Sequence, residues 1–356
     1  MLFYIANLFL LALIAYSLRK NPKIMYRVTF IWVFLIAALR GKGMGADYYV
    51  YQRYFDIFGN LNLVQILKRE DIEVGYVLLN RLVAVFGKSY QLFLAVCSML
   101  ALLGVFHFMK NFSASFYLSI WMYIAMGFYQ ATFTRIRQAI AIGIVLVAYK
   151  YAAKHDLKKF ILWIVGAIFF HSSAMAAIII YPLVKKEIKL KQFGFTLAGL
   201  LILFLMRNQV RELVFSIVGL LGYKKGYASL SEEGEGFYLL LVYFLIFAFV
   251  AFLYFYGKNR GKELNSVIIY DNRLLLNFSL LAVAFQILAT TFKLFNRCGE
   301  YFAIPMMVLL PNIVEKKFEV KSRFIVKILL MMVSLVFYIY SLSGTSSTVP
   351  YRFMWD

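Results

Sequence analysis

Long apolar runs recur along the whole chain, and their length limits what the chain can fold into. Several contain about 17–25 mostly apolar residues, the length that a helix needs to cross a bilayer. The 356-residue chain is 63% hydrophobic and 15% charged, which is far more apolar than a soluble globular domain. We therefore expect an all-α fold, a polytopic bundle of transmembrane helices. The run 2–18 has no basic segment before it and no cleavage pattern after it, so it is predicted to be the first span.

Basic residues gather in the short segments between the apolar runs. The first such cluster consists of Arg19, Lys20, Lys23 and Arg27. It predicts a cytoplasmic loop and an external N-terminus, because cytoplasmic loops are enriched in Lys and Arg. In a soluble protein, the net charge of +21 would suggest a nucleic-acid partner. Here orientation and anionic head groups explain most of it, so we expect membrane lipids and no nucleic acid as partners.

Charge and apolar pattern together predict about ten spans in one membrane domain, residues 1–356. The expected spans are 2–18, 26–39, 90–109, 116–130, 193–206, 237–256, 274–292, 301–314 and 324–342, with a further helix capped by Thr134. Outer loops are expected at about 40–89 and 207–236. The first loop contains an apolar run from Glu73 that is too short and too polar to span. We expect an amphipathic interfacial or re-entrant helix there.

The run 160–184 is compatible with two topologies. As one span, it would place the lysines that follow it outside, against the usual charge distribution. Two half-helices hinged at His171, Ser172 and Ser173 would keep both flanking basic clusters inside, and we favour this re-entrant hairpin. His171 is a lone imidazole in an apolar segment. It fits either a structural hydrogen bond with a neighbouring serine or carbonyl group, or an acid–base or sugar-hydroxyl contact.

Polar residues at the outer ends of the spans need their own explanation, because arginine is depleted there in membrane proteins. They are Arg40, Asp47, Glu73, Arg135, Arg137, Gln138, Arg297, Glu300 and Tyr301. Arg135 and Arg137 fall in the first turn of the helix after Thr134, where the helix dipole favours anions over cations. A bound phosphate or diphosphate would offset this cost, since guanidinium binds phosphate oxygens bidentately. Contact with lipid phosphates is the alternative.

The stretch RGKGMGADYYVY, residues 40–51, combines glycines with Arg40, Asp47 and tyrosines. Glycines allow a backbone to approach a ligand closely, because they carry no Cβ. The alternative is a solvated turn in which Asp47 caps a helix. Arg297 and Tyr301 share one helix face, which fits either a binding site or an ion pair with Glu300 beside an interfacial tyrosine.

Five short motifs follow one another between residues 40 and 302. They are Arg40 followed by Gly43, Gly45, Asp47 and Tyr51; Glu73 with Gly75 and Tyr76; R-Q-x-I-A from Arg137 to Ala141; H-S-S-A from His171 to Ala174; and Arg297 with Tyr301 and Phe302. With these motifs the chain resembles the EpsG family of Wzy-like polysaccharide polymerases, although Ala46 stands where Thr or a similar residue is expected. The resemblance implies a multi-pass enzyme of the bacterial cytoplasmic membrane. Such an enzyme joins undecaprenyl-diphosphate-linked oligosaccharide repeats on the outer face.

The mechanism that the resemblance implies assigns roles to the polar residues. The diphosphate is the leaving group, so Arg135, Arg137 and Arg297 would stabilise its charge. Asp47 is the first candidate for the catalytic proton acceptor, followed by Glu73 and His171. The rest of the expected substrate site consists of Arg40, Tyr51, Tyr76, Gln138 and Tyr301. We expect no cofactor and no metal ion, because the sequence has no metal-ligand spacing, and a chain-length regulator is a further expected partner.

Two other functions fit parts of the pattern. An O-antigen-ligase-like transferase would differ in its acceptor and share the logic of the site. A transporter or flippase of lipid-linked sugars would place charges near the bilayer midplane, on broken helices related by an internal repeat. The chain has no such repeat, and its unexplained charges gather on one side, which favours an enzyme.

Overall fold

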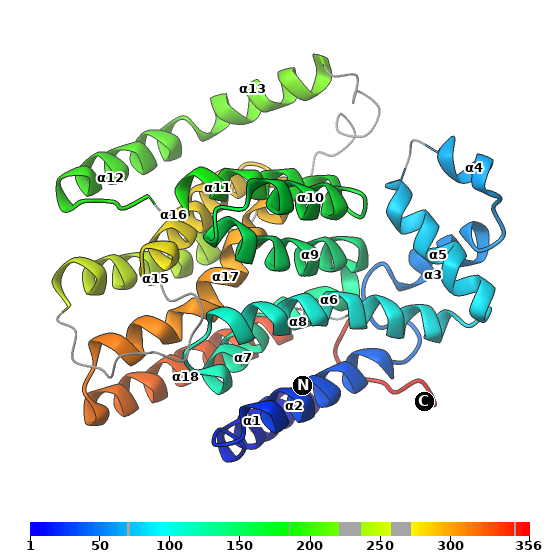
Figure 1. The fold of residues 1–356 in the computed structure, drawn as a ribbon, viewed down its shortest axis with the longest axis horizontal. Helices are drawn as coiled ribbons and strands as arrows, with labels where there is room; N and C mark the ends of the chain where they lie inside the picture. The colour runs from blue at the N-terminus through cyan, green and yellow to red at the C-terminus, as the bar shows by residue number, and fades with distance from the viewer. Residues whose placement is uncertain (70–71, 185, 221–235, 258–271, 345–346) are drawn as a thin grey trace. The chain divides into compact units, whose positions relative to one another are not determined.

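The computed structural model describes the chain except residues 70–71, 185, 221–235, 258–271 and 345–346. The described residues form helices joined by turns, with one isolated β-bridge (Figure 1). They divide into two compact units, residues 1–178 with 307–356, and residues 179–257 with 272–306. The expected all-α class is confirmed. Whether the two units belong to the single membrane domain expected from the sequence stays a prediction.

The first unit holds the N-terminal helices and the C-terminal one. Its elements are α1 Leu2–Ser17, α2 Pro22–Ala38, α3 Tyr48–Phe58, α4 Leu63–Leu67, α5 Val74–Phe86, α6 Tyr90–Phe112, α7 Phe116–Ala125, α8 Phe128–Thr134, α9 Ile136–Ala153, α10 Leu157–Ile168, the 3-10 helix η1 Ser172–Ile179, the end of α17 Leu294–Lys317, and α18 Val320–Ser343. The second unit contains α11 Ile180–Leu183, α12 Leu190–Leu205, α13 Arg207–Leu220, α15 Phe237–Tyr256, α16 Asn272–Ala289 and the start of α17.

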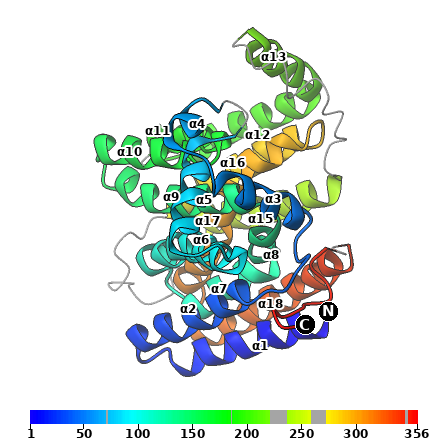
Figure 2. The same ribbon diagram turned by 90° about the vertical axis from the view of Figure 1, so that its right-hand side faces the viewer.

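Helices α6 and α9 form the centre of the first unit, with α2 packed against α6 and α10 against α9. Small residues let the two central helices approach closely. A Cβ on Gly143 would lie 2.8 Å from the carbonyl oxygen of Ala101, and Gly104 faces Gly143 across the interface. Figure 2 shows α3, α4 and α5 together on one side of this unit, and both chain termini near α1.

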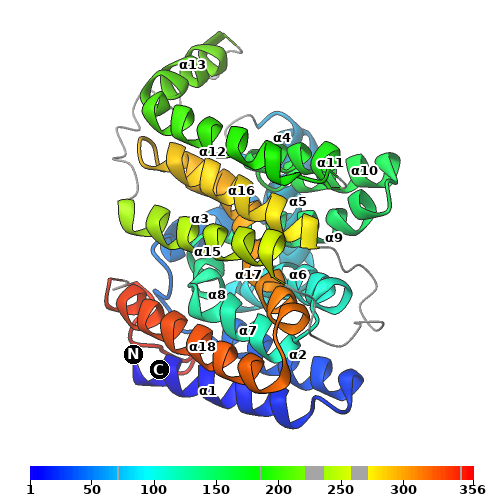
Figure 3. The ribbon, with the colours of Figure 1, turned by 90° about the vertical axis from the view of Figure 1, so that its left-hand side faces the viewer.

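In the second unit, α16 packs against both α15 and α12 (Figure 3). The side-chain amide of Asn277 on α16 donates to the carbonyl groups of Leu183 and Lys186, at 2.6 and 3.0 Å. These bonds hold the turn that leads into α12. The unit therefore has a defined helical framework of its own.

Four described helices are long and apolar enough to cross a membrane, namely α6, α9, α15 and α18. The pair α12–α13, bent by 73°, raises the number to five. Exposed apolar side chains such as Phe324, Val333 and Val336 line α18, and they suit contact with hydrocarbon. Helices α1, α5, α7 and α16 are apolar but shorter. The expected count of about ten spans stays a prediction.

Several boundaries differ from the expectations. The run 116–130 breaks between α7 and α8 at Gly127, whose φ of 79° is left-handed and stops the first helix. Residues 207–220, expected in a loop, form helix α13, while 221–235 lie outside the described residues. Helix α2 begins four residues early because Pro22 fits the first helical position. The run 160–184 does break at His171, between α10 and η1, but its folding back as a hairpin stays a prediction.

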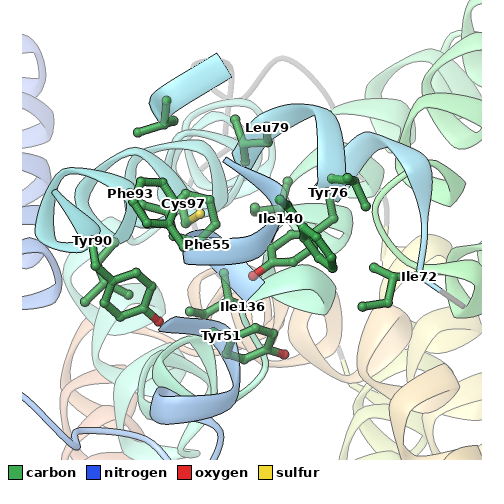
Figure 4. Packing of buried hydrophobic residues seen from close by; sticks show 14 of the residues in the cluster. Tyr51, Phe55, Ile72, Tyr76, Leu79, Tyr90, Phe93, Cys97, Ile136 and Ile140 are labelled. Atoms are coloured by element: carbon green, nitrogen blue, oxygen red, sulfur yellow. The ribbon is translucent and has the colours of Figure 1, made fainter. Parts of the chain in front are cut away.

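The expected outer loop at 40–89 contains three helices packed on an aromatic core (Figure 4). The core joins α3, α5, α6 and the start of α9. Its buried members include Tyr51, Phe55, Tyr76, Tyr90, Phe93, Cys97, Ile136 and Ile140. Helix α5 confirms the predicted helix after Glu73. Because α3 and α5 share this core with α6 and α9, the segment holds its side chains in place.

Candidate functional site

The start of α5 meets the first turn of α9 at an ion pair. Glu73 is the N-cap residue of α5, and its Oε2 pairs with Nη1 of Arg137. The other carboxylate oxygen, Oε1, accepts the backbone N–H of Ser172 at 3.1 Å. The Glu73 and Arg137 side chains are 19% and 25% exposed, so solvent reaches the pair without surrounding it. One carboxylate thus joins three segments of the chain.

A close backbone contact fixes this junction. The N–H of Gly75 donates to the carbonyl oxygen of Phe169 at 2.9 Å, just after α10 ends. A Cβ at position 75 would lie 2.6 Å from that oxygen, closer than side-chain carbons come. Glycine is therefore required for the first turn of α5 to dock beside His171.

His171 is held by the serine two positions later. Its Nδ1 accepts the backbone N–H of Ser173 at 3.3 Å and lies 2.8 Å from the Ser173 hydroxyl oxygen. A backbone N–H can only donate, so Nδ1 carries no proton and the neutral ring carries its proton on Nε2. The ring is buried, and the next residue, Ser172, binds Glu73. His171 therefore lies next in sequence to the residue that binds Glu73, and Ser173 fixes its tautomer.

Two tyrosines pack beside Arg137. The guanidinium carbon of Arg137 lies 5.8 Å from the ring centre of Tyr76, and the Tyr51 side chain is a hydrogen-bonding neighbour of the same guanidinium. The two rings are 5.9 Å apart, edge to face. Both are buried in the aromatic core. In this structure they orient Arg137 and do not present open ring faces to a sugar.

Arg40 is almost completely buried, at 1% exposure. Its Nη1 donates to the Ala37 carbonyl at the end of α2 and to the Ser98 hydroxyl of α6, at 2.5 and 3.0 Å. Its guanidinium carbon lies 5.0 Å from the ring centre of Phe133. Burial lowers the pKa of this guanidinium, and no carboxylate among the described residues pairs with it. These contacts fit a residue that ties helices together.

The C-terminal segment covers the glycine-rich stretch. The N–H groups of Gly41 and Gly45 donate to the carbonyl groups of Arg352 and Ser347, at 2.8 and 2.9 Å. A Cβ on Gly41 would collide with the Phe353 backbone, and Gly45 has a left-handed φ of 109°. Gly41 and Gly45 are thus explained by packing against the chain itself.

Asp47, Arg135 and Gln138 are three other expected site residues of the first unit. Asp47 is the N-cap of α3 and half-buried, and its side chain makes no hydrogen bond or ion pair with a described residue. The predicted cap at Thr134 is wrong by one residue, because α8 extends to Thr134 and Arg135 is the N-cap of α9. Arg137 remains in the first turn, and Gln138 is buried.

The last motif lies in the second unit. Arg297 and Tyr301 are one turn apart within α17, which begins at Leu294, earlier than the predicted start at 301. Arg297 is partly exposed, whereas Glu300 and Tyr301 are buried. The expectation that Arg297 and Tyr301 lie one turn apart on the same helix is therefore confirmed.

Sequence reasoning missed several contributors. The backbone N–H of Ser172, the carbonyl of Phe169 and the hydroxyl of Ser98 supply key hydrogen bonds. Ser172 lies in the H-S-S-A motif, so the sequence contains a signal for it. The sequence has no signal for the Phe169 carbonyl or for Ser98, because neither a backbone carbonyl nor a helical serine forms a recognisable motif. Within the described ranges, no three His, Cys, Asp or Glu side chains lie together as metal ligands.

Comparison with known proteins places the chain in a family. A model of the EpsG family matches residues 23–353, a range that includes all five motifs. No curated protein and no solved structure gives a match. Since the matched range covers nearly the whole chain, the protein belongs to the EpsG family, a family of Wzy-like polysaccharide polymerases.

Proposed function

We propose that this protein lengthens a surface polysaccharide by joining undecaprenyl-diphosphate-linked oligosaccharide repeats on the outer face of the bacterial cytoplasmic membrane. Membership of the EpsG family supports the reaction class. The observation that carries the site assignment is the Glu73–Arg137 pair at the start of α9. It keeps a guanidinium where the helix N-terminus also attracts an anion.

The reaction is a glycosyl transfer with a diphosphate leaving group. A hydroxyl oxygen of the acceptor repeat bonds to the anomeric carbon of the donor chain. The bond from that carbon to the diphosphate oxygen breaks, and its electron pair leaves on undecaprenyl diphosphate. Arg137 takes up part of this charge through its remaining donors, with Arg135 beside it at the N-cap. The arginines thus do the work that a metal ion would otherwise do.

The hydroxyl proton needs an acceptor whose lone pairs are available. Glu73 already binds Arg137 and Ser172, and Nδ1 of His171 already accepts a hydrogen bond. The Asp47 carboxylate makes no hydrogen bond or ion pair with any residue that the structure describes. The Asp47 backbone carbonyl accepts from Tyr51, which places it one helical turn from the tyrosine beside Arg137. We assign the proton to Asp47 and place Glu73 second.

The remaining expected residues have proposed roles of their own. His171 keeps its proposed contact with a sugar hydroxyl. Arg40 positions the stretch that carries Asp47, while Gln138, Arg297 and Tyr301 keep their proposed part in substrate binding. A chain-length regulator remains a proposed partner.

The direct test is synthesis by the purified protein. Synthetic undecaprenyl-diphosphate-linked repeat is supplied in proteoliposomes with a metal chelator, and products are separated on a gel. A ladder of lengthened chains supports the proposal. Transfer of one finished chain to a different lipid acceptor would indicate a ligase, and passage of the repeat across the bilayer without elongation would indicate a transporter.

Orientation is tested separately. Lys42→Cys, at an exposed position near Arg40, should react with a thiol reagent that reaches the outer face of the cytoplasmic membrane of whole cells but does not cross that membrane. Lys189→Cys should react only after the cytoplasmic membrane is opened. The reverse labelling pattern would place the site on the cytoplasmic side.

A further inference from the structure

Helices α12 and α15 enclose an apolar groove that the proposed polymerase site does not use. Its volume is about 270 Å³, and its walls include Leu190, Phe193 and Leu197 of α12 with Phe247, Ala248 and Phe255 of α15. The ring of Phe193 lies 4.9 Å from that of Phe255 and 5.9 Å from that of Phe247, so aromatic side chains line the groove near the start of α12. Among the described residues that line it, none is charged.

Three exposed lysines and one exposed glutamate, Glu187, lie next in sequence to the groove residue Leu190. Lys189 is the N-cap of α12, Lys191 follows Leu190, and Lys186 lies in the turn before them. Asn277 holds the carbonyl groups of this turn, so the lysines stand on a fixed backbone. The first N–H groups of a helix lack partners inside the helix and favour an anion. The apolar groove therefore lies next to a predominantly cationic segment at the start of α12, which we call the cationic rim.

We propose that the groove binds one acyl chain of an anionic glycerophospholipid, whose head-group phosphate lies at Lys189, Lys191 and the start of α12. Charge complementarity favours an anionic head group. Helix α15 is long and apolar enough to span the membrane, so lipid hydrocarbon is available to fill the groove. The lysine cluster belongs, by its charge, to the cytoplasmic side. The polymer forms on the opposite side in our proposal, so the occupant is a structural lipid and not the substrate.

Lipid binding to the delipidated full-length protein tests the proposal. Native mass spectrometry would compare phosphatidylglycerol with phosphatidylcholine carrying the same acyl chains, and phosphatidylglycerol should bind more tightly. The double variant Lys189→Gln/Lys191→Gln should bind phosphatidylglycerol about thirtyfold more weakly, which corresponds to about 2 kcal/mol. The matched control is Lys20→Gln/Lys23→Gln, which removes two exposed lysines beside the start of α2. Its affinity should equal that of the wild type.

A second variant tests the groove without touching the lysines. Ala248 is exposed in the groove wall, so Ala248→Phe should fill the slot and weaken phosphatidylglycerol binding while the cationic rim stays intact. Equal binding of phosphatidylcholine, or no loss in the lysine variant, would overturn the proposal. So would equal binding of soluble glycerol phosphate, which has no acyl chain. Displacement by undecaprenyl phosphate at lower concentration would make the groove a substrate slot. None of these readouts requires polymer synthesis, so they do not depend on the polymerase proposal.

Discussion

Glu73 and Arg137 form an ion pair although 64 positions separate them in the chain. Each residue lies at a helix start, Glu73 as the N-cap of α5 and Arg137 in the first turn of α9. A carboxylate is favoured at such a place and a cation is disfavoured. The pair therefore lets Glu73 offset the unfavourable position of Arg137, and in our proposal the same guanidinium also binds the diphosphate.

Removing the charge of Glu73 should destabilise the junction. Glu73→Gln keeps an acceptor for Ser172 but leaves Arg137 without its carboxylate, so we expect a loss of about 1–3 kcal/mol. The melting temperature of the detergent-purified protein reports this loss. Glu212→Gln breaks the exposed pair with Arg211 and should cost less than about 0.5 kcal/mol. In the double variant, adding Arg137→Gln to Glu73→Gln should lower the stability by less than Arg137→Gln does in the wild type. If the two losses simply add, the residues are not coupled.

Arg137→Lys separates charge from geometry. Lysine can still pair with Glu73, so the melting temperature should stay near that of the wild type. It lacks the planar fork that binds two phosphate oxygens, so polymer synthesis should fall at least about tenfold. Arg53→Lys, an exposed change on α3, is the matched control and should leave synthesis unchanged. Normal synthesis by the Arg137→Lys variant would mean that a point charge is enough.

Asp47→Asn tests the assigned base. The amide preserves shape but cannot take a proton, so the synthesis rate should fall by about 10²–10⁴-fold. The melting temperature should hold, because the Asp47 side chain makes no bond to a described residue. Asp56→Asn, at an exposed position on the same helix, should have no effect on rate. Full synthesis by the Asp47 variant would move the assignment to Glu73.

Gly41→Ala tests the C-terminal cover over the glycine-rich stretch. The added Cβ would collide with the Phe353 backbone, so we expect a loss of about 1–3 kcal/mol in stability. Gly166→Ala, within α10, is the control. No atom lies within 4 Å of the added Cβ, and alanine is a better helix former than glycine. That control should be neutral or stabilising by up to about 1 kcal/mol. An equal melting temperature for the wild type and the Gly41 variant would show that the segment is not clamped there.

The sequence by itself determined the helical class and the place of most helices. Helix α15, Phe237–Tyr256, has the bounds predicted for it, because an apolar run ended by glycines is a local signal. The break at His171 follows from the basic clusters that flank the run 160–184, because two half-helices keep both clusters on one side. Arg137 was placed correctly in a first turn, since helix starts also depend on neighbouring residues.

Only the tertiary structure decided which of these residues meet. Nothing near Glu73 indicates that Arg137 and the N–H of Ser172 will reach it, because contacts between distant positions leave no periodic pattern. The burial of Arg40 likewise depends on helix α6 and the C-terminal segment, which are remote in sequence. A glycine that serves a ligand and one that serves close packing look the same in sequence. The physical reason is that burial and pairing are properties of the packed chain, while helix formation is a property of its neighbouring residues.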